Sequence, residues 1–151
     1  MLNTALFKIL RTLDKDEIKR FEDFISSPYY NKKKKSAQLF KIIRKSLPAP
    51  KSPVTESNKK RLGFDHIWKA LYPGKKYNYG IMKNLIYDLK ILAEKFLSAE
   101  KFISDGFQSD FYLLEQYRER ALPALFVQKH KKTELNTGKN QSYIENYYMN
   151  L

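Results

Sequence analysis

Residues 79–104 read YGIMKNLIYDLKILAEKFLSAEKFIS and form the longest helical pattern in the chain. Asn78 stands directly before this pattern and is a residue type that caps helices. Apolar side chains recur along it in two adjacent stripes at helical spacing. The first stripe is Ile81, Leu85, Leu89, Leu92 and Phe96, and the second is Met82, Ile86, Ala93 and Leu97. We therefore predict a long central helix that packs against neighbours on two sides.

The residues before this helix hold four shorter helical patterns, and the first two lie near the N-terminus. Residues 2–13 place apolar side chains at i, i+3 and i+4, which is typical of an amphipathic helix. Asp14 then precedes a second helix, and Glu17 follows three residues later, so the two side chains can form a capping box. Pro28 ends this helix, because the residue before a proline is disfavoured in the helical conformation.

The third and fourth patterns flank a proline-rich loop. Asn31 is a capping residue type, and we predict that it caps a third helix over residues 32–47. Residues 48–57 hold three prolines and no periodicity, which predicts a loop. A fourth helix is predicted over residues 58–72, and the Pro-Gly pair that follows ends it.

Helical spacing continues after the long central helix. Asp105 and Gly106 are a turn signal, and a sixth helix is predicted over residues 107–121. Pro123 either kinks this helix or opens the next one at its first turn. A last helix is predicted to begin at Tyr143.

The chain contains no convincing strand pattern, and its helices are joined mostly by short turns. Short turns make consecutive helices antiparallel. We therefore predict an all-α fold of six to eight mostly antiparallel helices, arranged as a bundle or as stacked helical hairpins. We expect residues 1–151 to form a single helical domain, or the N-terminal part of a longer helical protein.

Most of the net charge of +13 lies in one segment, residues 32–76. This segment holds fourteen lysines and arginines against two acidic residues, which gives +12. Residues 1–31 sum to zero, and residues 77–151 sum to +1. Such asymmetry favours an anionic partner, which could be nucleic acid, membrane headgroups or an acidic protein surface. The candidate anion-binding residues are Lys32, Lys33, Lys34, Lys35, Lys41, Arg44, Lys45, Lys59, Lys60, Arg61, Lys75 and Lys76.

A second interpretation of the same segment is a solvated surface rich in lysine. Lysine outnumbers arginine by 23 to 6 in the chain, as AT-rich codon usage would produce. Codon usage alone does not place the excess in one segment. Tyr29 and Tyr30 precede the lysine run, where they either stack on bases or pack the turn onto the core.

Catalytic chemistry has few candidates in this composition. The chain holds no cysteine, which excludes disulfides, thiolate metal sites and cysteine nucleophiles. Its two histidines, His66 and His130, do not lie in a pattern typical of a catalytic triad or a metal site. Gly74 and Lys75 lack the upstream glycine and the following Ser or Thr of a phosphate-binding loop. We therefore expect no enzyme activity, no cofactor and no metal.

The N-terminal residues contain no targeting signal. Residues 1–8 lack the apolar core and the small-residue cleavage site of a signal peptide. No apolar run approaches the length of a membrane span. These features lead us to expect a cytoplasmic protein.

Two sequence motifs stand at turns of the predicted fold. FEDFISSPYYN, at residues 21–31, precedes a basic helix, and IWKALYPGKKYN, at residues 67–78, leads into the long helix with its AEKFL sequence at 93–97. In these motifs the chain resembles the N-terminal helical domain of an uncharacterised family of cytosolic proteins from Bacteroidota-type bacteria. The resemblance covers roughly residues 5–150. It implies a helical fold, with helical sequence following in longer members, and it supplies no site residues.

Two hypotheses for the function follow from these observations. The first is a non-catalytic helical module that works by protein–protein contact, with another protein or the rest of a longer chain as its partner. In this hypothesis the aromatic residues of the last helix meet the partner; they are Tyr143, Tyr147 and Tyr148. The alternative is binding of nucleic acid or another polyanion through the basic segment 32–76.

Overall fold

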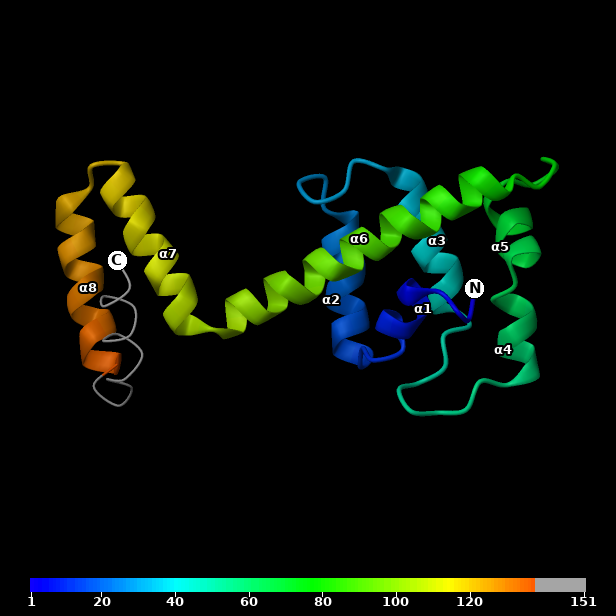
Figure 1. Cartoon of the computed structure of the whole chain (residues 1–151), viewed down its shortest axis with the longest axis horizontal. Helices are drawn as coiled ribbons and strands as arrows, with labels where there is room; N and C mark the ends of the chain where they lie inside the picture. The colour runs from blue at the N-terminus through cyan, green and yellow to red at the C-terminus, as the bar shows by residue number, and fades with distance from the viewer. Residues whose placement is uncertain (138–151) are drawn as a thin grey trace. The chain divides into compact units, whose positions relative to one another are not determined.

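A computed structural model describes residues 1–137 of the chain, and the side chains of residues 1–133. These residues form eight helices and no strand, which confirms the predicted all-α fold (Figure 1). The helices are α1 (Ala5–Leu10), α2 (Lys15–Ser26), α3 (Lys34–Arg44), α4 (Glu56–Arg61), α5 (Phe64–Leu71), α6 (Tyr79–Ser104), α7 (Gly106–Glu119) and α8 (Pro123–Thr137).

The chain divides into two compact units. Unit 1 is Met1–Ser98 and unit 2 is Ala99–Leu151. The boundary falls inside α6, which continues through it without a break. Sequence signals for domain boundaries are turns and polar linkers, so a boundary inside a regular helix has no such signal.

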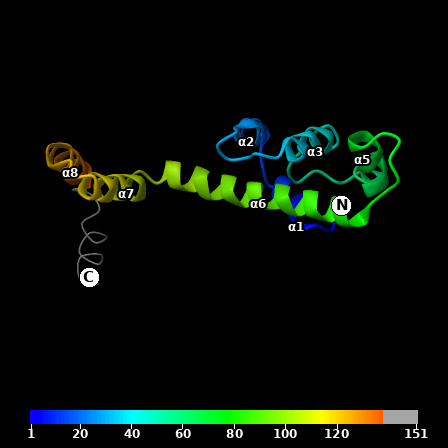
Figure 2. The ribbon, with the colours of Figure 1, turned by 90° about the horizontal axis from the view of Figure 1, so that it is seen from above.

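The core of unit 1 is built around α6, as the two apolar stripes predict. Figure 2 shows α2, α3 and α5 side by side along the same side of α6. The side chains that α6 buries are Met82, Leu85, Ile86, Leu89, Leu92, Ala93 and Phe96. Two residues of the predicted stripes are exposed. Ile81, the first residue of the first stripe, is 44% exposed, and Leu97, the last residue of the second stripe, is 39% exposed.

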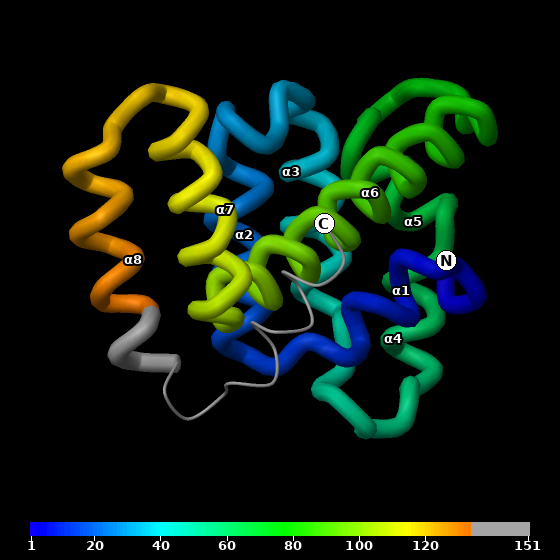
Figure 3. The backbone as a smooth tube through the Cα atoms, turned by 60° about the vertical axis from the view of Figure 1, so that its left-hand side comes forward, coloured from blue at the N-terminus to red at the C-terminus, as the bar shows by residue number. Residues whose placement is uncertain are grey.

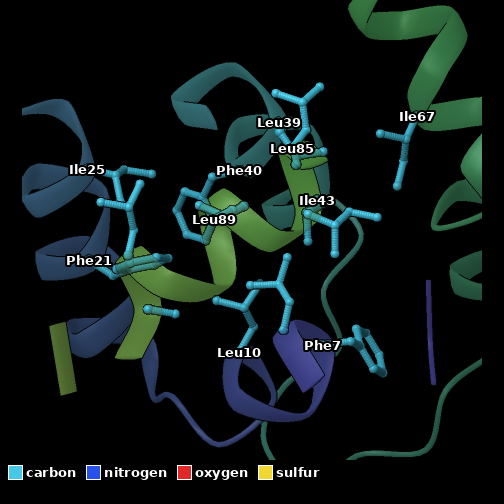
Figure 4. Packing of buried hydrophobic residues seen from close by; sticks show 14 of the residues in the cluster. Phe7, Leu10, Phe21, Ile25, Leu39, Phe40, Ile43, Ile67, Leu85 and Leu89 are labelled. Atoms are coloured by element: carbon cyan, nitrogen blue, oxygen red, sulfur yellow. The ribbon is translucent and has the colours of Figure 1, made fainter. Parts of the chain in front are cut away.

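Aromatic rings connect three helices in this core. Phe21 of α2 is fully buried and meets Phe40 of α3 edge to face, with ring centroids 4.9 Å apart. The same ring lies 5.2 Å from Phe96 of α6. Aliphatic side chains from α1 and α3, including Leu10 and Ile43, fill the space around them (Figure 4).

The capping box at the start of α2 is confirmed. Asp14 Oδ1 accepts hydrogen bonds from the backbone N–H groups of Asp16 and Glu17, both at 2.8 Å. Glu17 Oε2 in turn accepts from the Asp14 backbone N–H at 2.8 Å. The two side chains therefore satisfy three backbone donors at the helix start.

Replacing Asp14 by alanine should lower the free energy of unfolding by about 1 kcal/mol, within a range of about 0.5–2. The reason is the loss of the acceptor for two backbone donors. Urea unfolding monitored by circular dichroism measures the change. Lys15→Ala, an exposed substitution in the same turn, is the matched control and should stay within about 0.5 kcal/mol of the native chain. Equal effects of the two substitutions would contradict the capping role.

The start of α3 differs from the prediction. Asn31 does not cap this helix, because α3 begins at Lys34 and its N-cap residue, Lys33, makes no side-chain capping bond. Asn31 instead ties the turn to the end of α2: its Nδ2 donates to the Ile25 carbonyl at 2.8 Å, and its Oδ1 accepts from the Lys33 backbone N–H at 2.9 Å. The asparagine fixes the turn between the helices and leaves the helix start without a side-chain cap.

The predicted fourth helix consists of two helices, α4 and α5. Thr55 caps α4 through a capping box with Asn58, so the proline-rich loop ends at Thr55 and not at residue 57. Gly63 separates the two helices, and a Cβ atom at this position would lie 3.2 Å from the Lys60 carbonyl oxygen. Leu62 is buried at this bend and anchors it to the core.

Unit 2 contains the end of α6 together with the hairpin of α7 and α8 (Figure 3). Asp105 caps α7 by accepting from the Gln108 backbone N–H at 3.1 Å. Pro123 is the first residue of α8, so it opens this helix and does not kink the one before it. Asp110 of α7 joins the hairpin by pairing with Lys129 at 2.5 Å and accepting from Thr133 Oγ1 at 3.1 Å.

Candidate functional site

The twelve candidate anion-binding residues are all exposed, and they form two groups at the two ends of α3. The first basic group is Lys32, Lys33, Lys34, Lys35, Lys75 and Lys76. The second basic group is Lys41, Arg44, Lys45, Lys59, Lys60 and Arg61. Eleven helical residues separate the ends of α3, a length of about 16 Å at 1.5 Å per residue. The structure therefore divides the predicted segment into two surfaces.

The first basic group is held together by the ring of Tyr72. Lys35 Nζ lies over this ring at 4.8 Å from the centroid, and Lys75 Nζ lies at 5.8 Å. Lys35 Nζ also donates to the Leu71 carbonyl at 3.3 Å. Trp68 fixes the turn between α5 and α6, because its Nε1 donates to the Lys75 carbonyl at 3.0 Å. Lysines 40 residues apart in the sequence thus meet on one aromatic ring.

Tyr77 lies beside the first basic group. Burial, together with the nearby Asp65 carboxylate and the Tyr79 hydroxyl, raises the pKa of Tyr77 above its ordinary value. A tyrosine with an ordinary pKa of about 10 is already neutral at pH 7, so this rise leaves the Tyr77 hydroxyl protonated and without negative charge.

The second basic group is assembled where α4 meets the end of α3. Asn58 Nδ2 donates to the Ser46 carbonyl at 2.9 Å and thereby joins the two segments. This contact brings the cations of α4 to the same end of the fold as Arg44 and Lys45.

Three of the twelve basic residues are already paired with carboxylates in the part of the chain that the structure describes. Lys33 pairs with Asp88 at 2.7 Å, and Lys59 pairs with Glu56 at 2.5 Å. Arg44 pairs with Glu22 of α2. Exposed pairs of this kind contribute little to stability. The other nine carry no ion pair within the described residues and are free to meet an external anion.

A separate groove of about 600 Å³ lies in unit 1, next to the turn between α2 and α3. Its wall consists of Phe24, Tyr29, Tyr30, Ile91, Glu94, Lys95 and Ser98; we call it the aromatic groove. The ring of Tyr30 stacks on Phe24, with centroids 4.0 Å apart and planes inclined by 19°. None of the twelve candidate residues lines this groove.

Sequence reasoning identified the tyrosines of the aromatic groove but missed the residues that α6 contributes. Of the two alternatives for the tyrosine pair, packing of the turn onto the core holds for Tyr30, whose ring stacks on Phe24, whereas Tyr29 is 84% exposed. Glu94, Lys95 and Ser98 lie on the polar side of α6, and their spacing is that of any solvated helix surface. Only the position of the turn against α6 brings them into a groove.

The two histidines belong to different units. His66 is exposed on α5, whereas His130 is half-buried and stacks on Phe126 with ring centroids 5.8 Å apart. Among the side chains of residues 1–133, no three histidine or carboxylate groups gather to hold a metal ion. No helix within residues 1–137 is both long and apolar enough to cross a bilayer.

The predicted partner-contact residues Tyr143, Tyr147 and Tyr148 lie outside the described residues. The predicted last helix that carries them lies outside as well. Comparisons of the chain with protein-family models, with curated proteins and with solved structures find no match in any of the three.

Proposed function

We propose that the chain is a non-catalytic helical module that works by protein–protein contact, with the α7–α8 hairpin as its contact element. The supporting observation is the exposure of large apolar side chains on unit 2. These are Phe102, Ile103, Tyr112, Leu113, Leu122, Leu125 and Val127. Large exposed apolar surfaces mark interaction sites in soluble proteins.

The burial pattern of unit 2 strengthens this proposal. Not one of residues 99–133 is buried, although α6 buries seven side chains within unit 1. Helices in proteins owe most of their stability to packing of an apolar face, and two helices of 14 and 15 residues are too few to build a core. A protein partner that covers this face supplies the missing burial. Tyr143, Tyr147 and Tyr148 remain part of the proposed contact, and the cytoplasm is its proposed location, as the resemblance to cytosolic proteins implies.

The double substitution Leu113→Glu with Val127→Glu tests the contact element. Both side chains are exposed, so we expect the free energy of unfolding to change by less than about 1 kcal/mol. We expect the native chain to bind the apolar dye ANS, and the double variant to lose most of that fluorescence. As a control, Gln128→Glu adds one negative charge at an exposed polar position of α8 and should leave dye binding unchanged.

Photo-crosslinking in cells identifies the partner. A photoreactive residue at Val127 should give one discrete adduct with another protein, and the same residue at the exposed Lys19 of α2 should not. A native chain that binds no ANS and forms no adduct from position 127 would show that the hairpin is not a contact element.

The second candidate function is binding of nucleic acid or another polyanion through the basic segment. The observation in its favour is that nine of the twelve basic residues carry no ion pair within the described residues. Lys35 and Lys75 also converge on Tyr72 from distant parts of the sequence. Phosphates attract such clusters through counterion release, independently of base sequence.

A further inference from the structure

We propose that the aromatic groove binds a base of single-stranded nucleic acid, with the Tyr29 ring as the stacking surface. This inference deepens the second candidate function and rests on it. It adds a ligand class, single-stranded nucleic acid, and a site that lies outside the basic segment. All the residues that line the groove belong to unit 1.

Phe24 and Tyr30 form a packed support in the groove, and the Tyr29 ring beside them has an exposed face. Tyr30 stacks on Phe24 at 4.0 Å, and Phe24 packs against Phe96 of the core at 5.7 Å. Tyr29 meets Tyr30 edge to face, with centroids 5.0 Å apart and planes inclined by 88°. Because Tyr29 is 84% exposed, its ring has a face that no protein group covers. A planar base can stack on that face.

The turn that carries Tyr29 and Tyr30 is preorganised. Asn31 donates to the Ile25 carbonyl at 2.8 Å and accepts from the Lys33 backbone N–H at 2.9 Å. The backbone N–H groups of Tyr30 and Asn31 also donate to the Ser27 carbonyl, at 3.2 and 2.9 Å. A ligand therefore does not have to order this turn when it binds, which lowers the entropic cost of binding.

One cation lines the groove, and others follow its tyrosines closely in the sequence. Lys95 lines it from α6, and Lys32 begins the lysine run two residues after Tyr30. Two residues span at most about 7 Å, so the first lysines lie within reach of the phosphates next to a bound base. The one acidic side chain in the wall, Glu94, is paired with Lys90 at 2.9 Å. Its charge is thus partly compensated.

The combination of a free ring face and flanking cations favours a single strand over other polyanions. The bases of a duplex are already stacked on each other and do not present a face to Tyr29. An acidic peptide would satisfy the lysines and leave the ring uncovered. Single-stranded nucleic acid offers both a base for Tyr29 and phosphates for the lysines.

Fluorescence anisotropy with a labelled twelve-nucleotide oligothymidylate at 50 mM salt tests the inference on the full chain. Tyr29→Ala should weaken binding by about 5- to 150-fold, as loss of one stacked base does. Tyr29→Phe keeps the ring and should bind like the native chain. Tyr79→Ala removes a tyrosine that is 63% exposed and does not line the groove, and it should have no effect.

An abasic oligonucleotide of the same length separates stacking from charge. It keeps the phosphates but has no bases to stack on Tyr29. It should therefore bind more weakly than oligothymidylate, and Tyr29→Ala should not change its affinity. Equal binding of oligothymidylate by the native chain and by Tyr29→Ala overturns the inference. The inference also fails if Tyr29→Ala weakens binding of the abasic strand as much as it weakens binding of oligothymidylate. Preference for duplex DNA or for polyglutamate over the single strand also overturns it. If no nucleic acid binds at 50 mM salt, the second candidate function fails as well.

Discussion

Phe21→Ala is expected to lower the free energy of unfolding of unit 1 by about 3–5 kcal/mol. Phe21 is completely buried and touches rings from two other helices, Phe40 at 4.9 Å and Phe96 at 5.2 Å. The substitution removes both ring contacts and leaves a cavity where α2, α3 and α6 meet. A change of this size is a large fraction of the stability of a typical domain.

Tryptophan fluorescence during urea unfolding measures this change in unit 1 directly. The chain has one tryptophan, Trp68, which is buried in the core of unit 1. Phe102→Ala is the matched control, because Phe102 belongs to unit 2 and is 40% exposed. It should leave the Trp68 transition unchanged. If Phe21→Ala does not fold, Phe21→Leu keeps most of the volume and should cost less than about 1.5 kcal/mol. A loss below about 1 kcal/mol for Phe21→Ala would contradict the packing described here.

Binding of duplex DNA by the basic segment is expected to fall steeply with salt, and the steepness reports how many basic residues take part. The nine residues without an ion pair comprise five of the first basic group and four of the second. Each phosphate neutralised contributes a slope of about −0.9 to log K against log salt. Between 50 and 200 mM salt, nine contacts predict a loss of about 10⁵-fold, and five contacts about 500-fold.

Paired charge reversals assign that salt dependence to one group or to both. Lys34→Glu with Lys76→Glu changes the first basic group, and Lys45→Glu with Lys60→Glu changes the second. All four side chains are exposed, so the fold should tolerate the substitutions. If both groups bind one duplex, either pair lowers the slope. No binding at 50 mM salt, or a slope smaller in size than about 1, would show that the basic segment is a solvated surface.

The sequence by itself determined the features that depend on neighbouring residues. The all-α class, the limits of the long helix at Tyr79 and Ser104, and the capping box of Asp14 are all read from local spacing and local hydrogen bonds. The opening of α8 at Pro123 was one of two alternatives, because proline both ends a helix and fits the first turn of the next. Local signals of this kind need no knowledge of the rest of the fold.

Only the tertiary structure decided the features that depend on distant residues. Asn31 has the right chemistry for a helix cap, yet the Ile25 carbonyl, six residues back, is the partner of its side chain. The basic segment is one window in sequence and two surfaces in space, because its residues lie at opposite ends of α3. Lys95 enters the aromatic groove only because the turn at Tyr29 lies against α6. These contacts lie outside the i, i+3 and i+4 spacing of a helix, and helical periodicity holds no information about which faces meet.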